Sequence, residues 1–262
     1  MRFNSLLRPA TALLLLGSLS PLARAQEASV SMKLDLVSWG DDIPGLSLKS
    51  SGKGTPVTAK AFTYTKPVSY AGPAIMEIHQ EGADPAAAKA GAQNPAAISP
   101  ELKALREKDP SIVALAKLPA NSKRATVLIA AAQGGTYQTF VIDDDPTKLP
   151  LGKLRIHNYA PIRVAITCDG MKPIAMKTRD SFLATPKDGQ VVYELAYEKD
   201  GAWKTQENNL IAVTPDEQVQ LIILKSDASF FQNSDGSRSG FMQSVTLRRP
   251  GKDAPEPAAA TP

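Results

Sequence analysis

The sequence predicts an all-β protein, an antiparallel β-sandwich of the immunoglobulin-like or jelly-roll-like kind, with one short helix in an insertion. Three observations predict this class: apolar and polar residues alternate with period two, turn residues separate the alternating segments, and no helical segments connect them. Alternation places one set of side chains on one face of a strand. The missing helical crossovers argue against a Rossmann or TIM-barrel architecture. Hydrophobic residues make up 43% and charged residues 21% of the 262-residue chain, which is typical of a globular protein.

Residues 1–25 form a predicted secretory signal peptide. Arg2 and Arg8 accompany a short apolar run, and Ala23-Arg24-Ala25 provides the small-x-small pattern that signal peptidase cleaves. An N-terminal membrane anchor is the alternative, but a spanning helix needs about 20 apolar residues. We therefore expect an exported chain, periplasmic or extracellular after cleavage at Ala25. No later segment of the sequence is long and apolar enough to span a membrane.

Cleavage changes the charge of the chain. The full sequence has 30 basic and 26 acidic residues, a net charge of +4. The predicted signal peptide carries Arg2, Arg8 and Arg24 and no acidic residue, so the mature chain has 27 basic and 26 acidic residues. A net charge of +1 gives no basic footprint for nucleic acid. An envelope protein or a polysaccharide is the partner class that remains.

In the first half of the chain, the alternation predicts strands with one buried face. Residues 125–130 are apolar at both alternations, so this strand is expected to be buried on both faces. Gly134-Gly135 between two strands predicts a hairpin. The predicted strands of this half cover 30–36, 59–64, 76–78, 125–130 and 137–142.

The second half repeats the pattern after the strand-ending sequence Asp143-Asp144-Asp145-Pro146. Asp169-Gly170 and Lys199-Asp200-Gly201 predict turns between strands. The predicted strands cover 154–157, 164–168, 174–176, 191–197, a segment around Trp203, 219–224 and 241–247.

Two segments interrupt the strands. An Ala/Pro-rich insertion covers about 83–111, and within it Ser99-Pro100-Glu101 predicts a helix start, with Ser as N-cap and Asp109-Pro110 as the end. Residues 251–262 are expected to form a disordered tail. We expect one domain over 26–250, and two units split near 143–150 are the alternative.

Few residues suggest catalysis, because the sequence contains no G-x-S-x-G, Walker A, H-E-x-x-H or C-x-x-C motif. His79 and His157 are the only histidines and Cys168 the only cysteine, too few for a typical zinc site. We interpret the histidines as surface or strand-end residues and Cys168 as a small buried thiol. A Cys168 nucleophile paired with His157 is the alternative. No catalytic residue, metal ligand or cofactor is assigned.

The densest acidic cluster is Asp143-Asp144-Asp145. We interpret it as a solvated turn at a strand end, closed by Pro146. Two functional alternatives are a Ca²⁺ site built from oxygen ligands and an acid–base pair of a glycosidase. Asp41-Asp42 and Asn233–Gly236 are likewise turn sequences first and ligand candidates second.

Four aromatic residues are candidates for ligand binding: Trp39, Trp203, Tyr159 and Tyr197. Sugar-binding β-sandwiches stack ligands on exposed Trp and Tyr rings, which offer a flat apolar face and a polar edge. The alternative is that the two tryptophans close the ends of the hydrophobic core.

The stretch Leu149–Ala160, with its continuation through Val164-Ala165-Ile166 to Asp169-Gly170, resembles uncharacterised exported bacterial β-sandwich proteins. These carry a Leu-Pro-x-Gly turn, a strand and an Asn-x-Ser/Ala step. The stretch is also similar to short immunoglobulin-like modules of bacterial surface proteins. The resemblance covers about 20 residues. It implies an exported β-sandwich and no catalytic residue.

The sequence therefore predicts an exported, non-enzymatic β-sandwich that acts as a binding or structural module of the cell envelope. A carbohydrate-binding module that uses the exposed aromatic residues is the first alternative. A glycoside hydrolase with dispersed carboxylates is the second.

Overall fold

A computed structural model describes residues 29–50, 53–81, 97–225 and 242–251. Outside the described residues lie the predicted signal peptide, residues 83–96 of the predicted Ala/Pro-rich insertion, and the Asn233–Gly236 turn. The same holds for the predicted tail, apart from Gly251.

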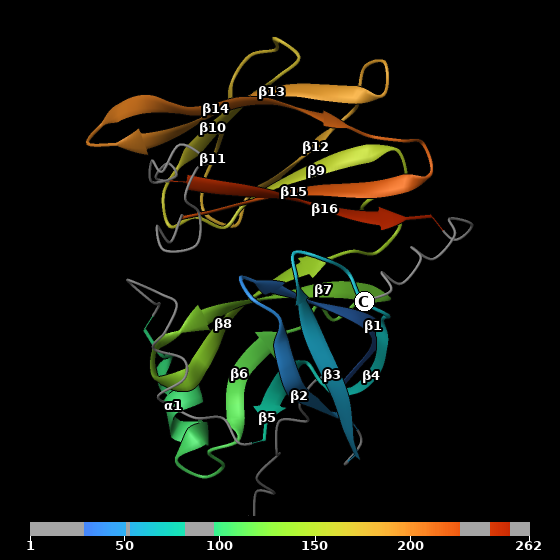
Figure 1. The fold of residues 1–262 in the computed structure, drawn as a ribbon, viewed down its shortest axis with the longest axis vertical. Coiled ribbons are helices and arrows are strands. Elements are labelled where there is room, and N and C mark those ends of the chain that lie inside the picture. Colours follow the sequence, from blue (N-terminus) through green and yellow to red (C-terminus); the bar gives the residue numbers. More distant parts are fainter. Residues whose placement is uncertain (1–28, 51–52, 82–96, 226–241, 252–262) are drawn as a thin grey trace, which may run out of the picture.

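The described chain is mostly β-strand with one α-helix, so the predicted all-β class is confirmed. Figure 1 shows the strands in two groups, which we call the N-terminal half (residues 29–143) and the C-terminal half (residues 153–250). The N-terminal strands are β1 (Ser29–Trp39), β2 (Ile43–Ser50), β3 (Lys53–Ala61), β4 (Val68–Pro73), β5 (Ile75–Gln80), β6 (Ile112–Lys117), β7 (Arg124–Ala132) and β8 (Thr136–Asp143). The C-terminal strands are β9 (Lys153–Asn158), β10 (Val164–Cys168), β11 (Ile174–Met176), β12 (Ser181–Ala184), β13 (Gln190–Lys199), β14 (Ala202–Ala212), β15 (Glu217–Lys225) and β16 (Met242–Pro250).

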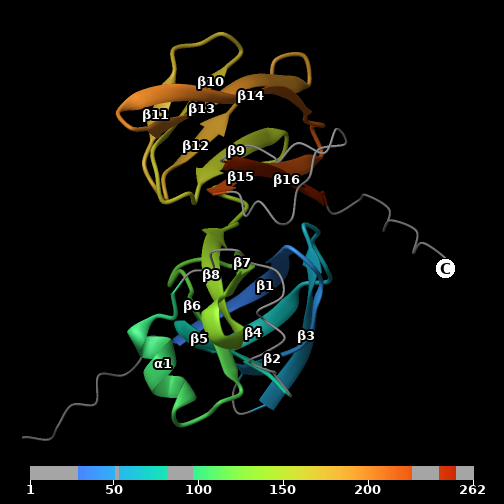
Figure 2. The ribbon, with the colours of Figure 1, turned by 60° about the vertical axis from the view of Figure 1, so that its left-hand side comes forward.

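The N-terminal half is one curled sheet in the order β6-β5-β2-β3-β1-β7-β8, with β4 paired to β1. Its two end strands approach each other, because the Thr139 hydroxyl on β8 donates to the Leu115 carbonyl on β6 at 2.6 Å. Figure 2 shows the strands wrapping around a common interior. The predicted hairpin is confirmed, since β7 and β8 pair antiparallel across Gly134 and Gly135. Both of these glycines have positive φ, the conformation that favours glycine.

The C-terminal half has two four-stranded sheets, β11-β10-β13-β14 and β12-β9-β15-β16, which lie one above the other in Figure 1. Both sheets contribute to one hydrophobic cluster; Leu154 and Leu221 come from one sheet, and Ile166 and Leu195 from the other. Cys168 belongs to this cluster and is 1% exposed, so the predicted buried thiol is confirmed.

Three strand pairs are parallel: β1 with β3, β1 with β7, and β9 with β15. The prediction of a wholly antiparallel arrangement is therefore wrong at these pairs. Alternation reports which face of a strand is buried and says nothing about the direction of the strand beside it. Parallel neighbours require a long connection, and here other strands of the same half form it.

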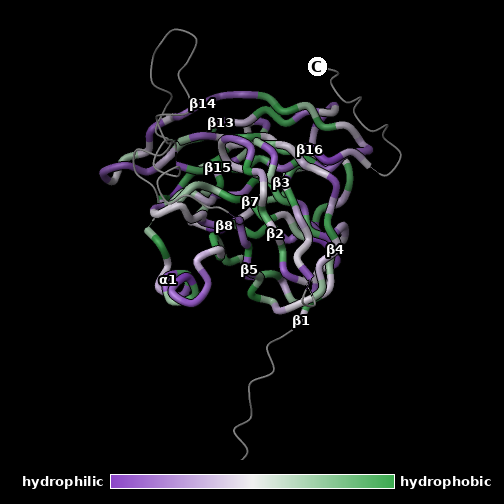
Figure 3. The backbone as a smooth tube through the Cα atoms, turned by 60° about the horizontal axis from the view of Figure 1, so that its bottom comes forward, coloured by the Kyte–Doolittle hydropathy of each residue, from purple (hydrophilic) through white to green (hydrophobic). Residues whose placement is uncertain are grey.

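The predicted helix is confirmed as α1 (Pro100–Arg106). The Ser99 hydroxyl accepts a hydrogen bond from the Leu102 backbone N–H at 3.2 Å, which is the expected N-cap. Leu102 is the buried residue of the helix, and the rest of α1 is mainly hydrophilic and stands beside the sheet (Figure 3).

A third hydrophobic cluster lies between the two halves. Val37, Leu128 and Ile142 come from the N-terminal half and meet three aliphatic side chains of β15 and β16. The contact explains a change along β1: its first residues alternate between exposed and buried, but from Leu34 to Ser38 every residue is buried. The C-terminal half covers the face of β1 that would otherwise be exposed, and Asp35 lies on that face.

Candidate functional site

Charged and polar side chains lie between the two halves. We call them the central cluster and define it by five buried residues and the half-buried Arg124: Asp35, Arg124, Thr126, Asp144, Gln220 and Arg249. The strand register places Asp35 on β1 directly opposite Thr126 on β7. Asp144 follows the end of β8, and its backbone N–H donates to the carbonyl of Arg124. Gln220 and Arg249 enter from the C-terminal half on β15 and β16.

Arg249 is the centre of the cluster. Its Nη2 lies 2.9 Å from Asp35 Oδ2 and 2.9 Å from Asp144 Oδ2. The same nitrogen donates to Thr126 Oγ1 at 3.1 Å, and Nη1 donates to Gln218 Oε1 at 3.2 Å. Both aspartates are 0% exposed, so the guanidinium of one half neutralises carboxylates that are buried in the other half.

Further hydrogen bonds satisfy the remaining oxygens of the two carboxylates. Arg124 donates to both oxygens of Asp35, from Nε at 2.9 Å and from Nη2 at 3.3 Å. Asp144 accepts a short hydrogen bond from the Thr126 hydroxyl and another from Gln220 Nε2 at 2.7 Å. Two carboxylates and two guanidinium groups give a formal net charge of zero. A buried ionic group of this kind is costly to break, because removing one partner leaves an uncompensated charge.

The electrostatics of Arg249 follow from these neighbours. Burial by itself would lower the pKa of its guanidinium, but Asp144, Tyr64 and Asp35 outweigh burial and raise that pKa. The guanidinium carbon also lies 4.1 Å from the centre of the Tyr64 ring, a cation–π contact. Burial, followed by the charge of Asp144, raises the pKa of Tyr64, so Tyr64 stays a neutral phenol.

Gln220 links the central cluster to His157. Its Nε2 donates to Asp144 and, at 2.9 Å, to the Tyr64 hydroxyl, so its Oε1 is free to accept. His157 Nε2 lies 2.9 Å from that oxygen and must therefore carry the proton. Burial, aided by Arg155, lowers the pKa of His157 to about 3, against a smaller opposing effect of the Gln220 hydrogen bond. The imidazole is neutral at physiological pH.

The interpretation of Asp143–Asp145 as a solvated turn is wrong for two of its three members. Asp144 is fully buried in the central cluster, and Asp145 is buried as well. Asp145 Oδ1 accepts from the backbone and the hydroxyl of Thr147, which closes the turn, while Asp143 pairs with Lys148. Asp144 is covered by Gln220 and Arg249 of the C-terminal half, whereas the turn that follows, residues 146–148, is exposed.

Both histidines are buried, so the interpretation as surface residues is wrong, whereas the strand-end position is confirmed, because each is the last but one residue of its strand. His157 faces the central cluster, whereas its neighbour Ile156 faces the hydrophobic cluster that contains Cys168. Burial and the charge of Asp169 raise the pKa of Cys168 to about 11, so the sulfur is a protonated thiol. His79 lies far from both in the sheet of the N-terminal half, where its Nδ1 is 2.9 Å from Ser111 Oγ.

The four aromatic candidates divide into two pairs. Trp39 and Tyr159 pack between the halves, Trp39 edge-on to Phe62 and Tyr159 parallel to His157. Trp203 and Tyr197 lie on the hairpin of β14 and β13. Trp203 is 46% exposed, whereas Tyr197 packs against the C-terminal hydrophobic cluster.

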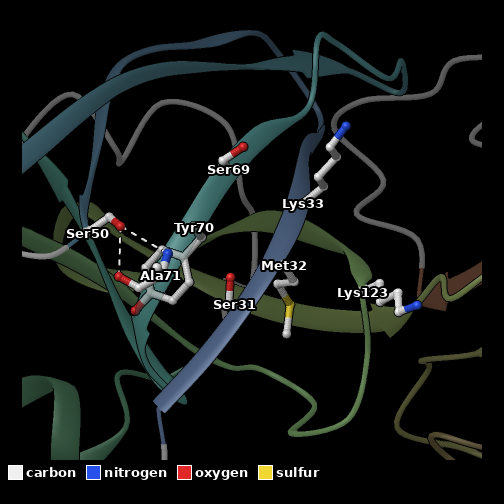
Figure 4. A pocket seen from close by; sticks show the side chains of 8 residues that line it. All are labelled: Ser31, Met32, Lys33, Ser50, Ser69, Tyr70, Ala71 and Lys123. Carbon is white, nitrogen blue, oxygen red and sulfur yellow. Dashed lines mark hydrogen bonds between the residues drawn. The ribbon is translucent and has the colours of Figure 1, made fainter.

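A surface pocket of about 410 Å³ lies where β1 pairs with β4 (Figure 4). Two lysines lie at its rim, Lys33 and Lys123, and Figure 4 shows both pointing outward. Ser50 closes one side, accepting from the Ala71 backbone N–H and donating to the Ala71 carbonyl. None of the residues that line this pocket belongs to the central cluster.

Within the described ranges, no group of three or more His, Cys, Asp or Glu side chains is arranged to hold a metal ion. Nor does the described part of the chain contain a helix long and apolar enough to cross a membrane. No protein-family model matches the sequence, and no curated protein matches it.

Sequence reasoning missed Asp35, Gln220 and Arg249. Asp35 and Gln220 each lie between two apolar residues, in Leu34-Asp35-Leu36 and Val219-Gln220-Leu221, whereas Arg249 lies between Arg248 and Pro250 at the end of its strand. A charged residue between apolar neighbours reads as the exposed side of a strand. One signal could have found the site. Val37 lies on the same face of the strand as Asp35 and is apolar, which indicates that this face is covered.

Proposed function

We propose that the mature chain is exported, through cleavage after Ala25, and acts as a non-enzymatic binding or structural module of the cell envelope. We further propose that the two sheets of the C-terminal half form a β-sandwich of immunoglobulin-like or jelly-roll-like type. In this proposal the central cluster is structural: it holds the two halves in one orientation, so that the outer surfaces of both are presented together.

The observation that carries this proposal is the position of Arg249 between Asp35 and Asp144. Both carboxylates contact the same nitrogen at 2.9 Å, so their oxygens lie within about 6 Å of each other. That upper limit admits the roughly 5–5.5 Å between the carboxyl groups of a retaining glycosidase, where a sugar lies between the two acids. Here a guanidinium fills the space and both carboxylates are inaccessible. The cluster therefore supports a structural role, in which it holds the two halves together, better than a role as a hydrolytic site.

A substrate panel tests the proposal. The chain without its predicted signal peptide (26–262) would be assayed on glycoside, ester and peptide substrates, alongside Asp144→Asn and the exposed control Asp41→Asn. We expect no turnover from any of the three proteins, and a lower melting temperature for Asp144→Asn only. Turnover that Asp144→Asn abolishes, while circular dichroism shows a folded protein and Asp41→Asn stays active, would overturn the proposal.

Fractionation tests the compartment. Expressed with its own N-terminus in a Gram-negative host, the chain should be recovered outside the cytoplasm, with Gln26 as its first residue. Cytoplasmic protein that begins at Met1 would contradict export. Cross-linking in the envelope fraction would then identify the partner.

One observation favours a second candidate, binding of carbohydrate at Trp203. Its ring is 46% exposed, and the Arg163 guanidinium carbon lies 5.6 Å from the ring centre. Tryptophan fluorescence would be titrated with cell-wall and plant polysaccharides, using Trp39→Phe so that Trp203 is the only reporter. Saturable quenching would support this candidate, and no response across a glycan array would dismiss it.

A further inference from the structure

β14 is an edge strand of unusual exposure. It ends the sheet order β11-β10-β13-β14, and among the described strands none pairs with its outer edge. All but three of its residues, Gln206, Glu207 and Ile211, are exposed. A long edge strand presents unpaired backbone N–H and C=O groups, to which another strand can pair. Figure 1 shows β14 running along the upper side of the C-terminal half, on the side remote from the N-terminal half.

A bulge divides β14 into two parts. Leu195 on β13 is opposite Glu207, and Ala196 is opposite Thr205, so Gln206 is an extra residue. A bulge of this kind shifts the alternation by one position. Without it, residues 203 and 210 would lie on opposite faces, because side chains in a regular strand alternate with period two.

The shift makes the outward face of β14 symmetrical. Its outward side chains are those opposite the outward residues of β13, namely Trp203 opposite Glu198, Thr205 opposite Ala196, Asn208 opposite Glu194 and Leu210 opposite Val192. These four positions are symmetrical about the midpoint between Gln206 and Glu207. The two ends of the series are large apolar side chains, 46% and 48% exposed.

We propose that this edge pairs with a second copy of the chain. The two β14 strands run antiparallel about a two-fold axis between Gln206 and Glu207, and the two four-stranded sheets become one continuous sheet. Trp203 then lies beside the partner's Leu210, and Thr205 lies beside the partner's Asn208. Each contact occurs twice, as a two-fold interface requires.

Charge does not oppose this register. Lys204 lies opposite the partner's Asn209, and Gln206 opposite the partner's Glu207, so no like charges face each other. Directly opposite residues of antiparallel strands are about 4.5–5.5 Å apart, close enough for Trp203 to cover the partner's Leu210. An unrelated strand would have no reason to match a symmetrical series, which is why the geometry points to an identical chain rather than to another protein.

Light scattering coupled to size exclusion tests the dimer over a range of concentrations, using 26–262. We expect the mass of a dimer, and dissociation constants at least tenfold weaker for Trp203→Asp and for Leu210→Asp. Leu183→Asp is the matched control, since Leu183 is 38% exposed on β12, the edge of the other C-terminal sheet. A wild-type monomer at all concentrations, or equal weakening by the control, would overturn the proposal.

Cysteine cross-linking tests the register itself. The double variant Thr205→Cys, Asn208→Cys should form a disulfide-linked dimer on non-reducing gels, because residue 205 of one copy is opposite residue 208 of the other. The single variants should stay uncross-linked, since each new cysteine would then be opposite a native residue. Equal cross-linking by either single variant, or none by the double variant, would contradict the pairing.

Discussion

The two histidines of the chain lie in polar clusters of opposite kinds. His157 belongs to a network between the halves in which Asp144, Gln220 and Arg249 are all buried. His79 is buried in the N-terminal half, but its acidic neighbours Glu77 and Asp109 have side chains that are 37% and 39% exposed.

We infer that the burial of a histidine's partners, rather than of the histidine itself, decides how much a polar cluster contributes to the free energy of unfolding. Partners that reach water can be solvated when a contact breaks, whereas buried partners cannot. We therefore expect substitutions in the central cluster to cost several times more than substitutions around His79. The predictions below test this, beginning with the largest expected effect.

Arg249→Met should lower the free energy of unfolding by about 3–5 kcal/mol, because it leaves the carboxylates of Asp35 and Asp144 buried without their shared cation. Urea denaturation of 26–262 measures the loss. Arg163→Met is the matched control, since Arg163 pairs with Glu198 at 3.1 Å and both side chains reach solvent, and it should cost no more than about 1 kcal/mol. Equal losses of unfolding free energy in the two variants would contradict the distinction between buried and exposed partners.

The pH dependence of stability should depend on His157. The pKa of His157 is about 3 in the folded protein and about 6.5 in the unfolded chain, so the unfolded state binds more protons between these values. The stabilisation is therefore fully present above about pH 6.5 and is lost as the pH falls toward 3, at up to about 1.4 kcal/mol per pH unit.

Replacing this histidine measures the effect. In His157→Gln, the fall of the unfolding free energy between pH 6.5 and 4 should be shallower than in the wild type. In His79→Gln, the unfolding free energy should fall with pH as steeply as in the wild type, because His157 is still in place. A wild-type slope in His157→Gln would show that this imidazole does not titrate on unfolding.

Gln220→Ala should cost about 1–3 kcal/mol, because it leaves the buried polar atoms of His157, Tyr64 and Asp144 each short of one hydrogen bond. Gln138→Ala, an exposed glutamine on β8, makes the same chemical change at the surface and should be nearly neutral. Thermal unfolding of both variants checks the difference. A neutral Gln220→Ala would mean that water replaces the lost amide.

The smallest effect is expected beside His79. Lys49 pairs with Asp109 at 3.3 Å, and both side chains are substantially exposed. Lys49→Ala should therefore lower the unfolding free energy by less than about 1 kcal/mol, and raising the salt concentration should shrink even that. A loss comparable to that of Arg249→Met would contradict the distinction between the two clusters.

Alternation in the sequence predicted the strands that bury one face. The segments 164–168 and 174–176 agree with β10 and β11 to the residue, and the doubly buried strand at 125–130 lies within β7. β6 was missed because its sequence, Ile-Val-Ala-Leu-Ala-Lys, is apolar on both faces and shows no period. β2 and β4 contain Pro44-Gly45 and Gly72-Pro73, which read as turns.

The central cluster could not be predicted in the same way. Asp35 and Arg249 are 214 positions apart, and each reads as an exposed polar residue of its own strand. Their contact exists only because the C-terminal half covers the second face of β1. Sequence periodicity does not show which other element covers a strand. The Asp143–Asp145 turn was found as a cluster of acids, but its burial depends on the same covering.

The central claim, that the buried cluster joins the halves into one cooperative unit, can be tested by unfolding with two local reporters. The chain has two tryptophans: Trp39 lies on β1 of the N-terminal half, and Trp203 lies on β14 of the C-terminal half. Urea unfolding would be followed by fluorescence in Trp203→Phe and in Trp39→Phe, each with and without Arg249→Met. In each variant the account predicts that fluorescence and circular dichroism give the same midpoint, and that both reporters shift to lower urea when Arg249 is replaced. Separate midpoints in the presence of Arg249, or a shift of one reporter only, would contradict it.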